Sequence, residues 1–117
     1  MSDEILDVKE FLERVQDDKE LLLELLDIYQ QDYREKRKLL TTALATNHYE
    51  DVRGIAHSLK GASGNISAKK VRTIFLKLED MGKLQNIAGH QQLLSALDTE
   101  YADLQKRMEQ IKKEFAA

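Results

Sequence analysis

The chain has 117 residues, of which 42% are hydrophobic and 33% are charged, and its formal net charge is −3. This length and balance fit one globular domain, here taken as 1–117, and argue against intrinsic disorder. The absence of cysteine excludes disulfides and any cysteine-based metal site or nucleophile. No apolar run reaches the roughly 18 residues of a membrane span and the start is too acidic for a signal peptide, so we expect a cytoplasmic protein without a membrane partner.

The residue types favour helices over strands. Proline is absent and there are only five glycines, whereas a fold with many strands and tight turns needs more of both. Leu, Lys, Glu, Gln and Ala dominate instead, and all five have high helix propensity. The composition therefore predicts an all-α fold.

Capping boxes, in which a short polar side chain is followed three residues later by glutamate, mark three helix starts. The pairs are Asp7 with Glu10, Asp17 with Glu20, and Asn47 with Glu50. We expect Ser67 to cap a fourth helix and residues 82–89 to form a loop. Apolar residues at three- and four-residue steps then predict helices over residues 8–15, 18–46, 48–66, 68–82 and 90–115.

Four long amphipathic helices joined by short links predict an antiparallel four-helix bundle, with the short N-terminal helix as an additional lid. The last helix carries a heptad-like apolar stripe: Leu93, Leu97, Tyr101, Leu104, Met108, Ile111 and Phe115. This stripe either packs into the bundle or extends past it for self-association. Few such stripes run the three or four heptads of a coiled coil, which favours packing and a monomer.

One histidine lies on the polar face of the predicted third helix. At 100° per residue, the apolar positions of this helix cluster within about 60° of one direction, and His57 points about 160° away from it. Gly54, Gly61 and Gly64 surround it, although each glycine inside a helix costs about 0.8–1 kcal/mol relative to alanine. These three glycines, the glycine clearing, indicate a surface kept bare so that another molecule can approach the imidazole.

The neighbourhood of His57 suits phosphoryl chemistry. An imidazole that is largely neutral near pH 7 is nucleophilic. Lys60, at i+3, offsets the charge of a phosphoryl group, and the glycine clearing leaves room for in-line attack. An incidental surface histidine is the alternative. Ser63 points to the opposite side, and we expect it to be a small packing and hydrogen-bonding residue.

The segment 57–68, HSLKGASGNISA, resembles the histidine-phosphotransfer pattern H-x-L-K-G-x-S-x-x-x-G-A. The matching positions are His57, Leu59, Lys60, Gly61, Ser63 and Ala68, and the helix layout fits that family over nearly the whole chain. Ser67 stands where the family usually has glycine. The resemblance implies a histidine-containing phosphotransfer (HPt) domain of a two-component phosphorelay. Such a domain accepts a phosphoryl group on Nε2 of His57 from a receiver-domain aspartate and passes it to another receiver-domain aspartate.

The resemblance also implies roles on the helix that follows. The family commonly has a polar side chain 22 residues after the histidine, which here is Glu79. Its implied role is to accept a hydrogen bond from the other imidazole nitrogen; a solvated surface glutamate is the alternative. Lys83, one turn further on, would assist the phosphoryl group or meet the partner, or would serve solubility alone. Lys69, Lys70 and Arg72 either extend the docking patch or form a solvated helix face.

The partners implied by the resemblance are response-regulator receiver domains and a hybrid sensor histidine kinase. The sequence has neither a G-x-x-x-x-G-K-[ST] nor a G-x-G-x-x-G loop, so we expect a phosphocarrier without a kinase site. No cofactor is expected, because Mg²⁺ would be held by the receiver domain. Residues 53–83 carry seven basic and two acidic residues, a patch that suits an acidic partner. The acidic chain as a whole argues against nucleic acid.

Two other functions are alternatives to phosphotransfer. A metal-binding bundle would need His48, His57 and His90, but no H-x-x-x-H or E-x-x-H spacing occurs, so no metal site is expected. A non-catalytic helical-bundle adaptor, which binds partners through the last helix, would explain the apolar stripe but not the glycine clearing.

Overall fold

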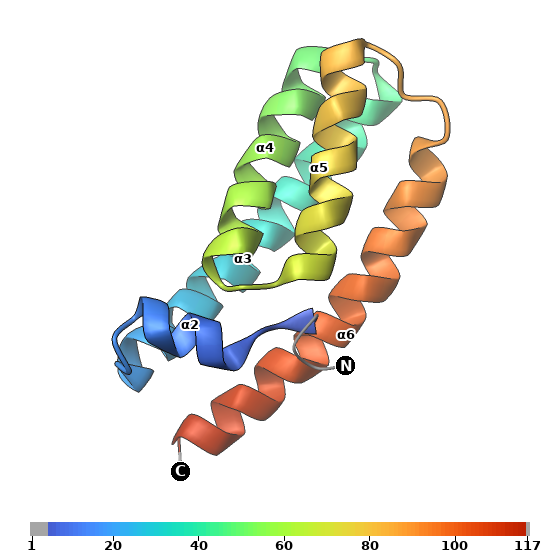
Figure 1. Ribbon diagram of the computed structural model, residues 1–117. Helices are drawn as coiled ribbons and strands as arrows, with labels where there is room; N and C mark the ends of the chain where they lie inside the picture. The colour runs from blue at the N-terminus through green and yellow to red at the C-terminus, as the bar shows by residue number, and fades with distance from the viewer. Residues whose placement is uncertain (1–4, 117) are drawn as a thin grey trace.

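The computed structural model describes residues 5–116, and four long helices and one short one make up its fold (Figure 1). The helices are α2 (Val8–Arg14), α3 (Lys19–Ala45), α4 (Tyr49–Asn65), α5 (Lys69–Leu84) and α6 (His90–Ala116). The all-α bundle is thereby confirmed, and every helix begins and ends within two residues of its expected range. Residues 1–4 and 117, which the expected domain includes, lie outside the described range.

The long helices alternate in direction along the chain, and α2 lies across the lower end of the bundle (Figure 1). Helices α4 and α5 pack side by side, with α3 behind them, and α6 packs against α5 and α3. The lower half of α6 runs past the connection between α4 and α5 (Figure 1). The outer face of the α4–α5 pair is not covered by the other helices (Figure 1).

A single hydrophobic core joins all five helices. Its members include Phe11 of α2, Leu26 of α3, Leu59 of α4 and Phe75 of α5, none of which is exposed to solvent. The apolar stripe of α6 completes it, because each of its residues is either buried or packs against the core. The stripe therefore packs within the bundle. Each large side chain buried there contributes about 1.5–3 kcal/mol to the stability of the fold.

Aromatic packing links α3 to α6. The rings of Tyr33 and Tyr101 stack with their centroids 3.6 Å apart and their planes inclined by 4°. Beside them the guanidinium of Arg37 donates to both carboxylate oxygens of Asp98, each at 3.2 Å. This pair is bidentate, which is the arrangement that holds two helices in a defined register.

The first predicted cap is confirmed and the second is wrong by one residue. The Asp7 carboxylate accepts from the Glu10 N–H at 3.0 Å and begins α2. At α3 the cap is Asp18, which accepts from the Leu21 N–H at 3.0 Å. Asp17 instead has a φ of 62°, and such a left-handed residue lies in the turn before a helix rather than at its first cap.

Asn47 and Ser67 are not N-caps either, because each is the left-handed residue of the turn that follows the preceding helix. Their φ angles are 57° and 61°. The next residues, His48 and Ala68, are the N-caps of α4 and α5 and make no side-chain cap bond. Each turn instead follows the Schellman pattern, in which the residue after the left-handed one donates back five residues, as Ala68 N–H does to the Ser63 carbonyl at 2.9 Å.

The end of α5 also differs from expectation. Residues 82–89 were expected to form a loop, but α5 continues through Leu84 and the left-handed residue that ends it is Gln85, with a φ of 54°. Gly82 is thus an interior helical residue. It is buried where α5 crosses α4: a Cβ at Gly82 would lie 2.6 Å from the backbone nitrogen of Arg53. The glycine is required here by close packing of two backbones.

Candidate functional site

His57 projects from the uncovered side of α4. Its side chain is 64% exposed, as its position opposite the apolar face predicts. A Cβ added at Gly54 or Gly61 would meet no other described atom within 4 Å beyond its own helix turn. At Gly64 the added Cβ would lie 3.2 Å from Nε of Arg72. The glycine clearing is therefore open at two of its positions and partly covered at the third.

Helix α5 brings Glu79 against His57. The carboxylate oxygen Oε2 lies 2.8 Å from Nδ1 of His57, and Oε1 accepts from Nζ of Lys60 at 2.6 Å. Glu79 is only 2% exposed, so the alternative of a solvated surface glutamate is wrong. The carboxylate is enclosed because it lies on the seam between α4 and α5, next to core residue Leu78.

The charge on Glu79 determines which nitrogen of His57 is free. The hydrogen bond from Lys60 is the largest influence that lowers the pKa of Glu79; burial opposes it, and the contact with His57 lowers it further. The carboxylate is therefore ionised near neutral pH, and an ionised carboxylate can only accept hydrogen bonds. Nδ1 of His57 must then carry the proton, which leaves the lone pair on Nε2 directed toward the open surface.

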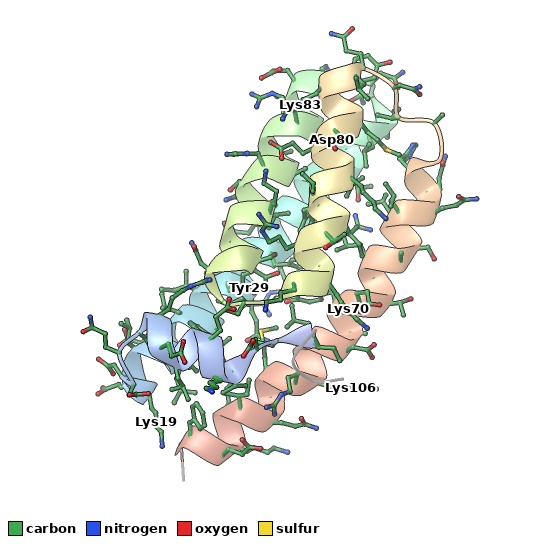
Figure 2. All side chains as sticks on the ribbon, in the orientation of Figure 1. Lys19, Tyr29, Lys70, Asp80, Lys83 and Lys106 are labelled. Carbon is green, nitrogen blue, oxygen red and sulfur yellow. The ribbon has the colours of Figure 1, made fainter. Side chains whose placement is uncertain are left out.

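Two lysines flank Glu79. Nζ of Lys60 donates to the carboxylate, and the Lys60 side chain is 20% exposed. Lys83 lies near the upper end of α5 (Figure 2) with its Nζ 3.9 Å from Oε2 of Glu79, and its side chain is 53% exposed. The Glu79 carboxylate thus contacts one imidazole and two lysines on the seam between α4 and α5. Of the two lysines, Lys83 is the more accessible to a partner.

Replacing Lys60 with methionine should destabilise the fold by about 2–3 kcal/mol at pH 7, because it leaves a buried carboxylate without its strongest partner. The pKa of Glu79 is depressed in the folded protein. The stabilisation is therefore present above the usual value of 4.5 and is lost as pH falls through the folded value. Urea unfolding at pH 7 and pH 4 should show the difference between wild type and Lys60→Met shrink at the lower pH.

Two variants complete that experiment. Lys77→Met changes an exposed lysine of α5 and should leave stability within about 0.5 kcal/mol of wild type. Adding Glu79→Gln to Lys60→Met should restore part of the lost stability, since it removes the buried charge that has lost its strongest partner. Equal stability of Lys60→Met and wild type at pH 7 would contradict the arrangement.

Sequence reasoning placed Ser63 correctly and missed two contacts at the site. Ser63 is fully buried and its Oγ lies 2.8 Å from the hydroxyl of Tyr29, as expected of an inward hydrogen-bonding residue. The missed contacts are those of Lys36, which reaches from α3 to donate to Ser58 Oγ at 2.6 Å, and of Gly82 with α4. No spacing rule within one helix connects residues of different helices, so neither had a sequence signal.

The three histidines do not meet. His48 contacts Thr46, His90 donates from Nδ1 to the Ile87 carbonyl at 2.8 Å, and His57 binds Glu79. Within residues 5–116 no three His, Cys, Asp or Glu side chains are grouped so that they could hold a metal ion. In the same part of the chain, none of the helices combines the length and the apolar character that crossing a membrane requires.

Comparison with known proteins agrees with this geometry. The Hpt domain family model matches residues 24–111. Histidine-containing phosphotransfer protein 2 of Arabidopsis thaliana is 26% identical over 103 residues, which are 84% of this chain and 66% of that protein, so the chain spans just under two thirds of that relative. The crystal structure of histidine-containing phosphotransfer protein B from Pseudomonas aeruginosa PAO1 superposes with a TM-score of 0.87 at 23% identity, covering 94% of this chain and 96% of that one. The chain belongs to the Hpt domain family.

Proposed function

We propose that this domain is a phosphorelay carrier that accepts a phosphoryl group on Nε2 of His57 from a receiver-domain aspartate and passes it to the aspartate of another receiver domain. The observation that carries the proposal is the contact of Nδ1 with Glu79, at 2.8 Å, on an imidazole whose other nitrogen faces an open surface. That contact selects the nitrogen that reacts. It also holds the ring in one orientation while a partner approaches.

The transfer balances without a further reactant. The Nε2 lone pair attacks phosphorus, the N–P bond forms as the O–P bond of the aspartyl phosphate breaks, and the aspartate carboxylate leaves with the electron pair. The ring becomes a cation that keeps its proton on Nδ1. Glu79 faces that proton, so its negative charge stabilises the cation as it develops. Onward transfer is the reverse reaction with a second receiver.

The remaining chemistry belongs to the partners. We place the Mg²⁺ that phosphoryl transfer uses on the receiver domain. The first phosphoryl group comes from a hybrid sensor kinase, which transfers it from ATP. The domain itself is then a carrier without a nucleotide site of its own. It acts in the cytoplasm as a monomer, since the apolar stripe of α6 is consumed by its own core.

Phosphoryl transfer from receiver domains tests the proposal. A panel of receivers phosphorylated with acetyl phosphate is mixed with the wild-type protein, and the transferred label is examined for its chemistry and position. We expect a label that is labile in acid and stable in alkali, as a phosphoramidate is, and that maps to the fragment holding His57. A label that maps to His48 or His90 would show that His57 is not the acceptor. No transfer from any receiver would refute the carrier function.

A further inference from the structure

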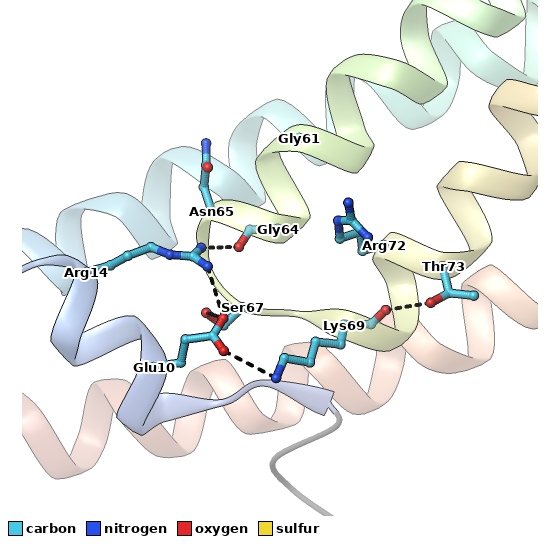
Figure 3. Close-up of a pocket in the computed structure, with 9 residues that line it drawn as sticks. All are labelled: Glu10, Arg14, Gly61, Gly64, Asn65, Ser67, Lys69, Arg72 and Thr73. Atoms are coloured by element: carbon cyan, nitrogen blue, oxygen red, sulfur yellow. Dashed lines mark hydrogen bonds and ion pairs between the residues drawn. The ribbon is translucent and has the colours of Figure 1, made fainter.

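A pocket of 660 Å³ opens beside the glycine clearing, where α2, the end of α4 and the start of α5 meet (Figure 3). Gly61 and Gly64 form the wall nearest to His57. Its charged lining consists of three cations and one carboxylate, a net formal charge of +2: Arg14, Lys69, Arg72 and Glu10. We call it the lower pocket. Lys70, although near in sequence, does not line it.

Two of the cations are held by acidic groups within the protein. Glu10 lies 3.0 Å from Arg14 and 3.3 Å from Lys69, and it also accepts from the buried hydroxyl of Ser67 at 2.8 Å. Arg14 additionally donates to the Gly64 carbonyl. These contacts lower the pKa of Glu10, with the Ser67 hydroxyl as the largest cause. Glu10 therefore remains ionised and fastens α2 to the turn between α4 and α5.

Arg72 is the third cation of the lower pocket, and it does not contact Glu10. Within residues 5–116 its guanidinium forms none of the ion pairs found in the structure. The side chain lies over Gly64 (Figure 3), with Nε 3.2 Å from the place of an added Cβ. Its charge thus faces the same side of the molecule as the glycine clearing.

A receiver that reaches His57 must also cover the lower pocket. A standard interface buries about 800 Å² on each partner, which corresponds to a disc of roughly 16 Å radius. Gly61 and Gly64 lie only about 6 Å and 10 Å from His57 along the axis of α4, at a rise of 1.5 Å per residue. The pocket is therefore inside the footprint, and an uncharged partner surface there would bury the Arg72 cation without a counter-charge, which is costly.

We infer that the lower pocket binds a carboxylate side chain of the receiver domain and that Arg72 is the residue that pairs with it. This inference rests on the proposed function and names the recognition chemistry of the same site. It assigns Arg72 to docking, remote from the reacting atoms. Its loss should therefore slow association at low receiver concentration and leave the transfer step at saturation unchanged.

The test uses the receiver that transfers fastest to the wild-type protein, phosphorylated with acetyl phosphate. We expect Arg72→Glu to lower kcat/KM by about tenfold, through KM, and to flatten the dependence of kcat/KM on salt. Lys77→Glu is the matched control, because it makes the same charge change on α5 about 140° around the helix from Arg72. It should stay within about twofold of wild type.

A second variant keeps the arginine in place. Thr73 also lines the lower pocket, and Thr73→Glu should raise KM as well by putting a carboxylate beside Arg72. Circular dichroism establishes that each variant is folded. Wild-type kinetics in Arg72→Glu and Thr73→Glu, or equal losses in Arg72→Glu and Lys77→Glu, would overturn the docking role while leaving the carrier function intact. Absence of transfer to the wild type would instead remove the carrier function and this inference with it.

Discussion

Replacing His57 with glutamine should abolish phosphoryl acceptance from every receiver that labels the wild-type protein. The label requires the Nε2 lone pair, and a glutamine amide nitrogen has no lone pair available for attack on phosphorus. The fold should be almost unaffected, within about 0.5 kcal/mol, because the side chain is 64% exposed. The glutamine N–H can still donate to the buried carboxylate of Glu79.

Parallel measurements separate loss of chemistry from loss of binding. Labelling by a phosphorylated receiver measures the chemistry. Titration with the unphosphorylated receiver measures binding, and urea unfolding measures the stability of the fold. His90→Gln serves as the control, since His90 lies at the start of α6 and should label normally. Persisting label in His57→Gln would mean that another residue carries the phosphoryl group. Undiminished signalling by an unlabelled His57→Gln protein would point to the adaptor function.

Replacing Gly82 with alanine should destabilise the protein by about 2 kcal/mol, even though alanine is the better helix former. The added Cβ would lie 2.6 Å from the nitrogen and 2.9 Å from Cα of Arg53. Both are backbone atoms, so no side-chain rotation relieves the contact and α5 must move away from α4. Because Glu79 lies on α5 one turn earlier, the displacement should also loosen its contact with His57.

Gly61→Ala is the matched control for that substitution. It too replaces glycine by alanine inside a helix, but the new Cβ has no described atom near it beyond its own turn. It should raise the free energy of unfolding by up to about 1 kcal/mol. Urea denaturation of both variants measures the two effects with opposite sign. If both changes stabilise the protein, the close approach of α5 to α4 at Gly82 is wrong.

The helices were predictable because their signals are local. Apolar spacing and the Asp7 cap depend on neighbours within one turn, and these remained valid in the folded chain. The errors lie where two adjacent residues offer the same chemistry or where φ becomes positive. Asp17 and Asp18 are both good caps, and only the turn geometry selects the second. A φ of 61° at Ser67 also explains why glycine is usual there in the family, because glycine adopts that conformation without steric cost.

The site was predictable in part for a different reason. The position of His57 opposite the apolar face follows from helical periodicity, and the glycine clearing from the cost of glycine inside a helix. The contact with Glu79 crosses from α4 to α5, and it was expected only through the family resemblance. The pairing of Lys60 with this carboxylate depends on how α5 is rotated about its axis. Packing across the core determines that rotation.

The stacked rings of Tyr33 and Tyr101 provide an intrinsic spectroscopic probe. The chain has four tyrosines and no tryptophan, so its near-ultraviolet circular dichroism arises chiefly from tyrosine rings held in fixed, asymmetric surroundings. This pair joins α3 to α6, whereas His57 lies on the seam of α4 and α5. Detachment of α6 would thus be visible as a change in the tyrosine band before far-ultraviolet ellipticity falls. The motion of one helix can be followed in the unmodified protein, without an introduced fluorophore.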